Sequence, residues 1–508
     1  MKTLRDVWRN TVEKFPVKTA FICDDASVTF READKITDRL RSAMAAEFGL
    51  RPGDRVSVAM PNCLEYCLIY WAVVKAGAVV VPVNIRLRAE EMRHVIENAD
   101  ASILFLHASV WGNVIGHARQ SSCVKHIVAV GGSPEGDAVS YEQLAGHEIT
   151  PCAEPEADPE GLVIIMHTSG TTGRPKGAMM RHCDIFFNVR NAIIAQSFRH
   201  EDVHLLVVPM FHCTALYSML PSGAYLGSTI VVAPKADMRY LVELIQKHRI
   251  TTFMGVPTMF YFLTTLEGLE TYDLSSVRLI AYAGSVMPTR TIQMLRERFP
   301  RASLHNFFGL TETISMTHVL PSADALLHPD SVGKPLPEIH TRIIGDDGLD
   351  LPKGRVGELC FHRDNIIPGY WKQDGLLEKS MTPDGWFRTG DLACSDEEGF
   401  LYIKGRSKEM IIVGGENVYA LEVENVIMQH PGVLEAAVVG IPATGVRAYL
   451  GELVKAVVVP RPGHELGELD IKKHCAGHLA NYKIPHFVEF RDALPRNASG
   501  KVLKRDLQ

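Results

Sequence analysis

Short apolar runs rich in valine, isoleucine and leucine alternate with amphipathic segments over most of the chain. The runs have the length and composition of buried strands and cover residues 55–60, 79–83, 103–106, 127–130, 162–166, 205–209, 229–232 and 279–283. Between them, residues 240–249 and 289–299 repeat their apolar positions at helical spacing. Strands that alternate with helices predict an α/β fold, in which helices cover parallel sheets.

The pattern changes near residue 341. From there to about residue 404, short strands are joined by turns at Asp347-Gly348 and Glu398-Gly399, which is typical of antiparallel hairpins. We therefore expect an N-terminal domain over 1–405 that contains an antiparallel β subdomain at about 341–404.

The last hundred residues predict a small α+β domain over 406–508, called the C-terminal lid below. Its expected elements are helices at 421–429 and 469–479 and strands at 434–441, 453–459 and 487–490. Lys408 lies in the short junction between the domains, which has the length of a hinge.

The composition is that of an ordinary globular protein. The chain has 508 residues, 46% hydrophobic and 22% charged, so it can bury a large core without disulfides. Its net charge of −6 argues against nucleic acid as a partner. The ten cysteines form no CxxC pair, which favours free thiols in a reducing compartment. The longest apolar run, 67–83, contains Lys75, Gly77 and Pro82 and favours buried structure over a membrane segment. A cytoplasmic protein is therefore expected.

A stretch rich in glycine and hydroxyl groups follows the apolar run at 162–166. It consists of Thr168, Ser169, Gly170, Thr171, Thr172, Gly173, Arg174, Pro175, Lys176 and Gly177. Glycines let backbone N–H groups approach phosphate oxygens, hydroxyls add donors, and Lys176 adds positive charge. The spacing does not match a Walker A loop. The stretch favours a polyphosphate-binding loop, and a flexible surface loop is the alternative.

Two further stretches place a carboxylate near a glycine. In residues 306–312, Glu312 could hold Mg²⁺ through water and phosphate oxygens, and Phe308 could stack on a purine. A buried aromatic strand end is the alternative. In residues 385–392, Asp391 follows Gly390 and suits a grip on two ribose hydroxyls, whereas a solvated hairpin turn is the alternative.

The order of these stretches resembles the adenylate-forming (acyl-activating) enzyme superfamily, and within it the AMP-forming acyl-CoA synthetases, or acid–thiol ligases. The resemblance spans nearly the whole chain and also includes residues 405–409, 414–419 and 494–501. Shorter matches lie at 53–56, 75–78, 209–212, 357–359 and 369–371. No single motif is decisive, but together, in this order, they identify the chain as a member.

The resemblance implies a large N-terminal domain with two parallel-type sheets covered by helices, the antiparallel β subdomain, and a small mobile α+β lid. It also implies a two-step reaction. A carboxylic acid attacks the α-phosphate of ATP to give an acyl-adenylate and pyrophosphate, and the thiol of coenzyme A then displaces AMP. ATP, Mg²⁺, coenzyme A and a small-molecule carboxylic acid are the expected reactants and cofactors, and a homodimer is left open.

The resemblance assigns roles to individual residues. The phosphate-binding loop from Thr168 to Lys176 would hold the β- and γ-phosphates, Thr311 would lie beside it, and Glu312 would bind Mg²⁺. The ribose would be held by Asp391 and Arg406. The remaining nucleotide-binding residues would be Gly284, Ser285, Asn306, Phe308 and Gly309.

Lys501 would reach from the lid to the charge that develops at the carboxylate and the α-phosphate. A solvated lysine in a basic tail is the alternative. The lid would rotate about Lys408 between the two half-reactions, and in its second pose the loop with Gly414 and Gly415 would shape the pantetheine tunnel. His212 matches the family position that gates the acyl pocket, and a core histidine beside Cys213 is the alternative.

The expected acyl pocket is lined by mixed small and apolar residues from 212–217, 254–257, 283–287 and 308–314. No arginine or lysine stands out to pair a second carboxylate. A medium-sized monocarboxylic acid, aliphatic, alicyclic or aromatic, is therefore favoured. The chain departs from the family pattern at His167, where an aromatic residue is frequent, and at Phe308, where tyrosine is frequent.

Three other functions compete with this interpretation. A stand-alone adenylation enzyme would load a carrier protein instead of coenzyme A. A luciferase-like oxygenase would need O₂-dependent light emission, which nothing in the sequence requires. A non-enzymatic nucleotide-binding module is disfavoured because Lys501, Glu312 and Asp391 occur together.

Overall fold

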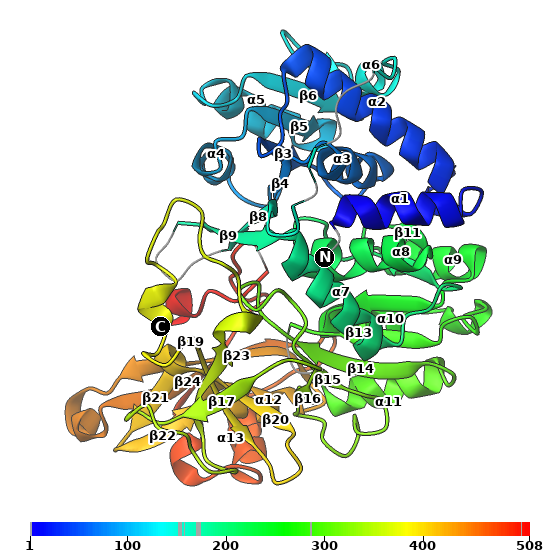
Figure 1. Ribbon diagram of the computed structural model, residues 1–508. Helices are drawn as coiled ribbons and strands as arrows, with labels where there is room; N and C mark the ends of the chain where they lie inside the picture. The colour runs from blue at the N-terminus through cyan, green and yellow to red at the C-terminus, as the bar shows by residue number, and fades with distance from the viewer. Residues whose placement is uncertain (1–2, 151–154, 157, 169–173, 285–286, 499) are drawn as a thin grey trace.

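The computed structural model describes residues 3–150, 155–156, 158–168, 174–284, 287–498 and 500–508. Two large sheets form the body, and the antiparallel subdomain and the C-terminal lid lie together beside it (Figure 1). None of the helices in this described part combines the length and hydropathy that a membrane span needs. Of the expected site residues, Ser169, Gly170, Thr171, Thr172, Gly173 and Ser285 lie outside the described ranges.

Seven strands of the described chain form the first sheet, in the order β7-β6-β5-β3-β4-β8-β9. They are β3 (Arg55–Ala59), β4 (Val79–Pro82), β5 (Ile103–His107), β6 (His126–Val130), β7 (Val139–Ser140), β8 (Leu162–Thr168) and β9 (Lys176–Arg181). All neighbours are parallel except β8 and β9.

Helices cover both faces of this sheet. They are α2 (Phe30–Phe48), α3 (Leu64–Lys75), α4 (Ala89–Asn98), α5 (Trp111–Arg119) and α6 (Tyr141–Ala145). Phe105 packs in the apolar cluster that contains α2 and α3, whereas Leu104 and Leu106 pack in the cluster of α4 and α5. This alternation follows from the twofold period of strand side chains and explains the continuous apolar runs in the sequence.

The second sheet has the order β16-β15-β14-β13-β12-β10-β11-β1-β2. Its strands are β1 (Thr19–Cys23), β2 (Ala26–Thr29), β10 (Val203–Leu206), β11 (Thr229–Val232), β12 (Thr252–Gly255), β13 (Leu279–Tyr282), β14 (Ser303–Phe308), β15 (His318–Leu320) and β16 (Lys334–Pro335). The centre is parallel, and the pairs at both edges are antiparallel.

One apolar cluster joins the inner faces of both sheets through α3, α7 (His182–Gln196) and α8 (Leu220–Leu226). The outer face of the second sheet packs against α9 (Met238–His248), α10 (Pro257–Thr264) and α11 (Thr289–Arg298). Helix α1 (Leu4–Lys14) contributes Trp8, which stacks on Trp71 at 4.6 Å between ring centroids. The two sheets therefore share one apolar core.

The antiparallel subdomain consists of β17 (Thr341–Ile344), β18 (Gly357–His362), β19 (Trp386–Ser395) and β20 (Leu401–Arg406). The lid has a hairpin, β21 (Met410–Val413) and β22 (Glu416–Tyr419), and a sheet of β23 (Val433–Pro442), β24 (Glu452–Pro460) and β25 (Phe487–Phe490). Helices α12 (Ala420–Met428) and α13 (Glu468–Ala476) complete its separate core. The expected α/β fold class, with its antiparallel subdomain and small α+β lid, is confirmed.

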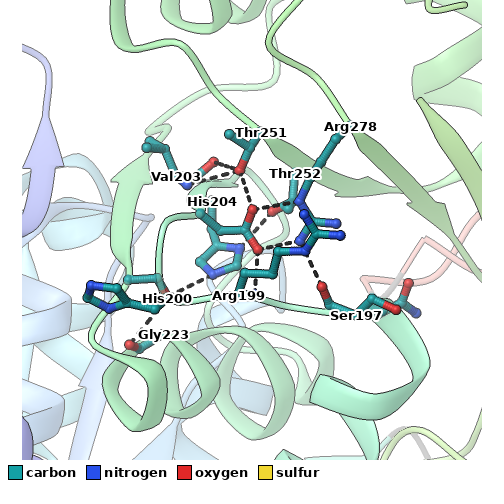
Figure 2. Close-up of polar contacts among 12 residues, drawn as sticks. Ser197, Arg199, His200, Val203, His204, Gly223, Thr251, Thr252 and Arg278 are labelled. Atoms are coloured by element: carbon teal, nitrogen blue, oxygen red, sulfur yellow. Dashed lines mark hydrogen bonds and ion pairs between the residues drawn. The ribbon is translucent and has the colours of Figure 1, made fainter. Parts of the chain in front are cut away.

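A buried polar network ties together the amino ends of β10, β12 and β13 (Figure 2). Asp202, which precedes β10, accepts hydrogen bonds from the Arg278 guanidinium and from Thr251 Oγ1 at 2.7 Å. His204 contacts Thr252 Oγ1 at 2.6 Å and Ser228 Oγ at 2.9 Å through its two ring nitrogens. Because active sites of α/β sheets form at the opposite, carboxyl ends of the strands, this network is structural.

Candidate functional site

The candidate site forms where the segments that follow β8, β10 and β14 meet. Thr311 follows β14, and its Oγ1 atom lies 3.9 Å from the Sγ atom of Cys213, in the segment after β10. The carboxylate of Glu312 is joined to the start of β9 through Tyr370. These are carboxyl ends of parallel strands, which is where open α/β sheets bind ligands.

Both ends of the expected phosphate-binding loop lie in this site. Thr168, the last residue of β8, pairs with Lys176, the first residue of β9. Lys176 is half-buried, and its Nζ lies 5.7 Å from the centroid of the Tyr370 ring. The pairing of β8 and β9 therefore fixes the two ends of the loop, and Lys176 places a cation at the second end.

The loop after β14 has a strained backbone. A Cβ atom at Gly309 would lie 1.3 Å from the backbone oxygen of Ser315, so only glycine fits there. Ile314 and Ser315 have φ values of +60° and +77°, which non-glycine residues rarely adopt. Such strain costs on the order of 1–3 kcal/mol per residue and occurs mostly at functional sites. Here the two residues with positive φ lie two and three positions after Glu312.

Glu312 is fixed through both its backbone and its side chain. Its backbone oxygen accepts a hydrogen bond from Ile367 N at 2.9 Å, and its Oε1 accepts one from Tyr370 Oη at 3.0 Å. The described residues contain no group of three or more His, Cys, Asp or Glu that could hold a metal alone. One carboxylate combined with phosphate oxygens is a common arrangement for Mg²⁺, so Glu312 fits this ion when a nucleotide is bound.

The residues expected around the adenine lie on neighbouring strands. Asn306 is buried on β14, and its Nδ2 donates to Ser331 O at 2.9 Å. Phe308 is half-buried and makes an edge contact with His318 at 6.0 Å between centroids. Gly284 follows β13 with a φ of +92°. Asn306 is thus oriented by the protein itself before any base is bound.

Asp391 and Arg406 face each other on β19 and β20. Arg406 Nε lies 2.8 Å from Asp391 Oδ1, and its guanidinium also donates to Thr389 O at 2.9 Å. Asp391 is only 6% exposed, and its Oδ2 is buried without a hydrogen-bond partner among the described residues. Burial raises the pKa of Asp391 to about 6, against the opposing charges of Arg406 and Lys501. A buried acceptor without a donor suits a ligand hydroxyl.

Lys501 comes to this site from the lid. It is exposed, and its backbone is held in a turn in which Lys501 N donates to Asn497 Oδ1 at 2.9 Å. The neighbouring Ala498 O accepts a hydrogen bond from Asn84 Nδ2, in the segment after β4, at 3.2 Å. The charge of Lys501 acts on both Asp391 and His212. Lys501 therefore lies within electrostatic range of both residues, and its role in the site stays a prediction.

His212 and Cys213 precede a turn of π-helix, Thr214–Met219, a distortion that is frequent at functional sites. Burial, together with the charges of Arg86 and Lys501, lowers the pKa of His212 to about 4. His212 is therefore neutral at pH 7 and adds no positive charge beside Lys501. Its ring makes an edge contact with Phe211 at 4.9 Å between centroids.

Lys408, Gly414 and Gly415 are exposed on the lid. Lys408 lies in the 3₁₀ turn Ser407–Glu409, directly after β20. The two glycines form the tip of the β21–β22 hairpin with φ values of +60° and +89°. The roles of these three residues stay predictions.

Two polar residues at the site received no role from the sequence. Tyr370 was recognised only as part of a short motif, because its contact with Glu312 joins positions 58 residues apart. His167, on β8, contacts Asn98 Oδ1 at 2.9 Å through Nε2, while its Nδ1 is buried and has no hydrogen-bond partner within the described ranges. Burial lowers the pKa of His167 to about 3, so it is a neutral residue at the root of the phosphate-binding loop.

Comparison with known proteins agrees with this geometry. The family described as AMP-binding enzyme matches residues 8–371, and the AMP-binding enzyme C-terminal domain matches 422–501. The chain belongs to the AMP-binding enzyme family, and thus to the adenylate-forming superfamily. Its relatives place it among the AMP-forming acid–CoA ligases.

Individual relatives cover nearly the whole chain. An indoleacetate–CoA ligase from Aromatoleum aromaticum is 33% identical, over 97% of this chain and 95% of that protein. ScoC from Streptomyces coeruleorubidus, a fatty acid–[acyl-carrier-protein] ligase, is 33% identical over 97% of this chain and 93% of that protein. The crystal structure of the anthranilate CoA ligase AuaEII with anthranoyl-AMP matches with a TM-score of 0.92 and 25% sequence identity. The match covers 99% of this chain and 96% of that one.

Proposed function

We propose that this chain activates a medium-sized monocarboxylic acid with ATP and transfers the acyl group to coenzyme A. In the first half-reaction, a carboxylate oxygen attacks the α-phosphorus and pyrophosphate leaves. In the second, the thiol of coenzyme A attacks the acyl carbon, loses its proton, and AMP leaves. One site serves both steps, because the adenylate remains bound while the thiol enters.

The observation that carries this proposal is the position of Lys501. Its charge acts on Asp391, the ribose candidate, and on His212, the candidate gate of the acyl pocket. In the proposed complex, a cation within electrostatic range of both groups faces the acid and the α-phosphate. There it offsets the negative charge that builds up as the carboxylate approaches the phosphate.

The other residues hold the reactants. Asp391 Oδ2 accepts a ribose hydroxyl, Arg406 keeps the Asp391 carboxylate in place, and Asn306 and Phe308 border the base. Lys176 and Thr311 bind the outer phosphates, and Glu312 provides the place for Mg²⁺, which neutralises phosphate charge when bound. Since phosphoryl-type transfer depends mainly on positioning and electrostatics, this set of residues fits adenylation.

The nature of the acid follows from the pocket wall. In the expected pocket after β10, Cys213 and Ala215 have small side chains, and His212 is neutral, so that Arg86 is, besides Lys501, the cation whose charge acts there. A monocarboxylic acid stays the prediction. The relatives act on both aryl and fatty acids, which supports testing aromatic, alicyclic and aliphatic members side by side.

A carrier protein is the second candidate acceptor, because ScoC is named as a ligase for an acyl carrier protein. The two acceptors can be distinguished by measuring AMP release from a panel of acids with ATP and Mg²⁺, once with coenzyme A and once with a carrier protein. We expect turnover with coenzyme A alone and accumulation of the corresponding thioester. Turnover that needs a carrier protein, with none on coenzyme A, would move the assignment to the second candidate.

A further inference from the structure

The segment 367–371 runs beside the first residues of β9 and has no role in the reaction as described above. Met179 N donates to Gly369 O at 3.1 Å, and Trp371 N donates to Gly177 O at 2.8 Å. These bonds frame a β-bridge between Ala178 and Tyr370. The backbone of Tyr370 is therefore fixed relative to the strand that begins at Lys176.

The same segment is fixed to the Glu312 loop. Ile367 N donates to the backbone oxygen of Glu312 at 2.9 Å. On its other side, the guanidinium of Arg363 donates to Ile367 O at 2.7 Å and to Pro368 O at 2.9 Å. The segment thus bridges β9 and the Glu312 loop as one rigid piece.

The side chain of Tyr370 touches a charged group at each end of this bridge. Its Oη donates to Glu312 Oε1 at 3.0 Å, and its ring centroid lies 5.7 Å from Lys176 Nζ. Lys176 and Ala178 lie two positions apart on β9 and therefore on one face. The small side chain of Ala178, opposite Tyr370, leaves room for the aromatic ring beside the ammonium group.

We propose that Tyr370 is a positioning residue that couples the metal-binding carboxylate to the phosphate-binding lysine. Its hydroxyl sets the direction of the Glu312 carboxylate, and its ring holds the Lys176 ammonium group by a cation–π contact. The bond from Tyr370 occupies one of the several acceptor positions of the carboxylate and leaves others for a cation. The inference rests on the proposed function, in which Glu312 faces Mg²⁺ and Lys176 faces the outer phosphates.

The expected consequence concerns the cooperation between Mg²⁺ and ATP. In Tyr370→Phe the ring and the backbone bridge remain, so Lys176 keeps its partner and metal-free ATP binds within about twofold of wild type. The Glu312 carboxylate loses its fixed direction. Hydrogen bonds to charged groups are strong enough that the gain in ATP affinity caused by Mg²⁺ should fall about tenfold to hundredfold.

The test is calorimetric titration of ATP into the full-length enzyme, once with saturating Mg²⁺ and once with EDTA. The ratio of the two dissociation constants is the measured coupling. Tyr370→Phe should lower this ratio, whereas Tyr370→Leu, which also removes the ring, should weaken metal-free binding as well. The matched control is Tyr402→Phe, because Tyr402 Oη also donates to a carboxylate, Asp396 Oδ2, at 2.9 Å but outside the site.

The outcomes are distinguishable. A wild-type ratio in Tyr370→Phe would overturn the inference, and so would an equal loss of affinity with and without Mg²⁺. A fall in melting temperature much larger than that of Tyr402→Phe would assign the bond to stability and would also overturn it. Glu312→Gln tests the proposed function separately: if it keeps the full ratio, the metal role of Glu312 fails, whatever Tyr370→Phe shows.

Discussion

Arg406 Nε lies 2.8 Å from Asp391 Oδ1 across β19 and β20, while Asp391 Oδ2 is buried without a protein donor among the described residues. The ion pair keeps the carboxylate in place, and burial keeps water from its second oxygen. A ligand hydroxyl that donates a hydrogen bond to Oδ2 therefore removes the free-energy cost of a buried acceptor that has no donor. In the proposed function that donor is a ribose hydroxyl.

ATP binding should depend on pH through Asp391. Its pKa in the folded protein is raised to about 6, so the carboxylate is ionised at pH 7.5 and becomes protonated below pH 6. Because the ionised form accepts ribose hydroxyls best, affinity should fall as pH drops through 6, by up to about tenfold per unit. Titration calorimetry at pH 7.5, 6 and 5 measures this. The same series with 2′,3′-dideoxy-ATP should fall less steeply, because only protonation of the triphosphate remains, and an equally steep fall would refute the ribose role.

Lys501→Ala should separate the two half-reactions. The rate of adenylation, measured as pyrophosphate release, should fall about 10²–10³-fold, as expected for the loss of one preorganised charged donor. Thioester formation from pre-made acyl-adenylate should stay within a few-fold of wild type. Arg505→Ala removes a nearby exposed cation, paired with Asp506 at 3.3 Å, and should leave both rates unchanged. Equal losses in both half-reactions of Lys501→Ala would contradict the proposed role.

The Asp202–Arg278 pair should support stability and not activity. Arg278→Met leaves a carboxylate that is 2% exposed without its guanidinium, which should cost about 3–5 kcal/mol of unfolding free energy. Chemical denaturation measures this difference. Lys247→Met breaks an exposed pair with Asp25, 3.1 Å long, and should change stability by no more than about 1 kcal/mol. A similar, small effect of both substitutions would show that the buried network is not a structural clamp.

Buried neutral histidines should make the protein sensitive to mild acid. Burial lowers the pKa of His182 and His204 to about 4 and that of His318 to about 3. Below the unfolded-state pKa of about 6.5, the unfolded chain binds protons that the folded chain excludes. The unfolding free energy should therefore fall between pH 6.5 and about 4, each histidine adding up to about 1.4 kcal/mol per pH unit. Denaturation midpoints that stay constant from pH 7 to 5 would contradict this.

The sequence by itself determined the class of fold and the order of the motifs. Apolar runs and turn residues are local signals, and they marked the parallel strands, the antiparallel subdomain and the lid because strand and helix periodicities are properties of neighbouring residues. Glu312 and Asp391 were recognisable in the same way, since each follows a glycine, whereas Lys501 was identified through the resemblance to the family. Their roles, and the residues at 169–173 and Ser285, stay predictions.

Only the tertiary structure decided how these residues act on one another. The unpaired oxygen of Asp391, the low pKa of His212 and the bond between Tyr370 and Glu312 arise from burial and from contacts between distant segments. Local sequence carries no information on such contacts, because they depend on where the sheets and the lid pack. Desolvation and hydrogen bonding, which set charge and direction in the site, exist only once that packing is complete.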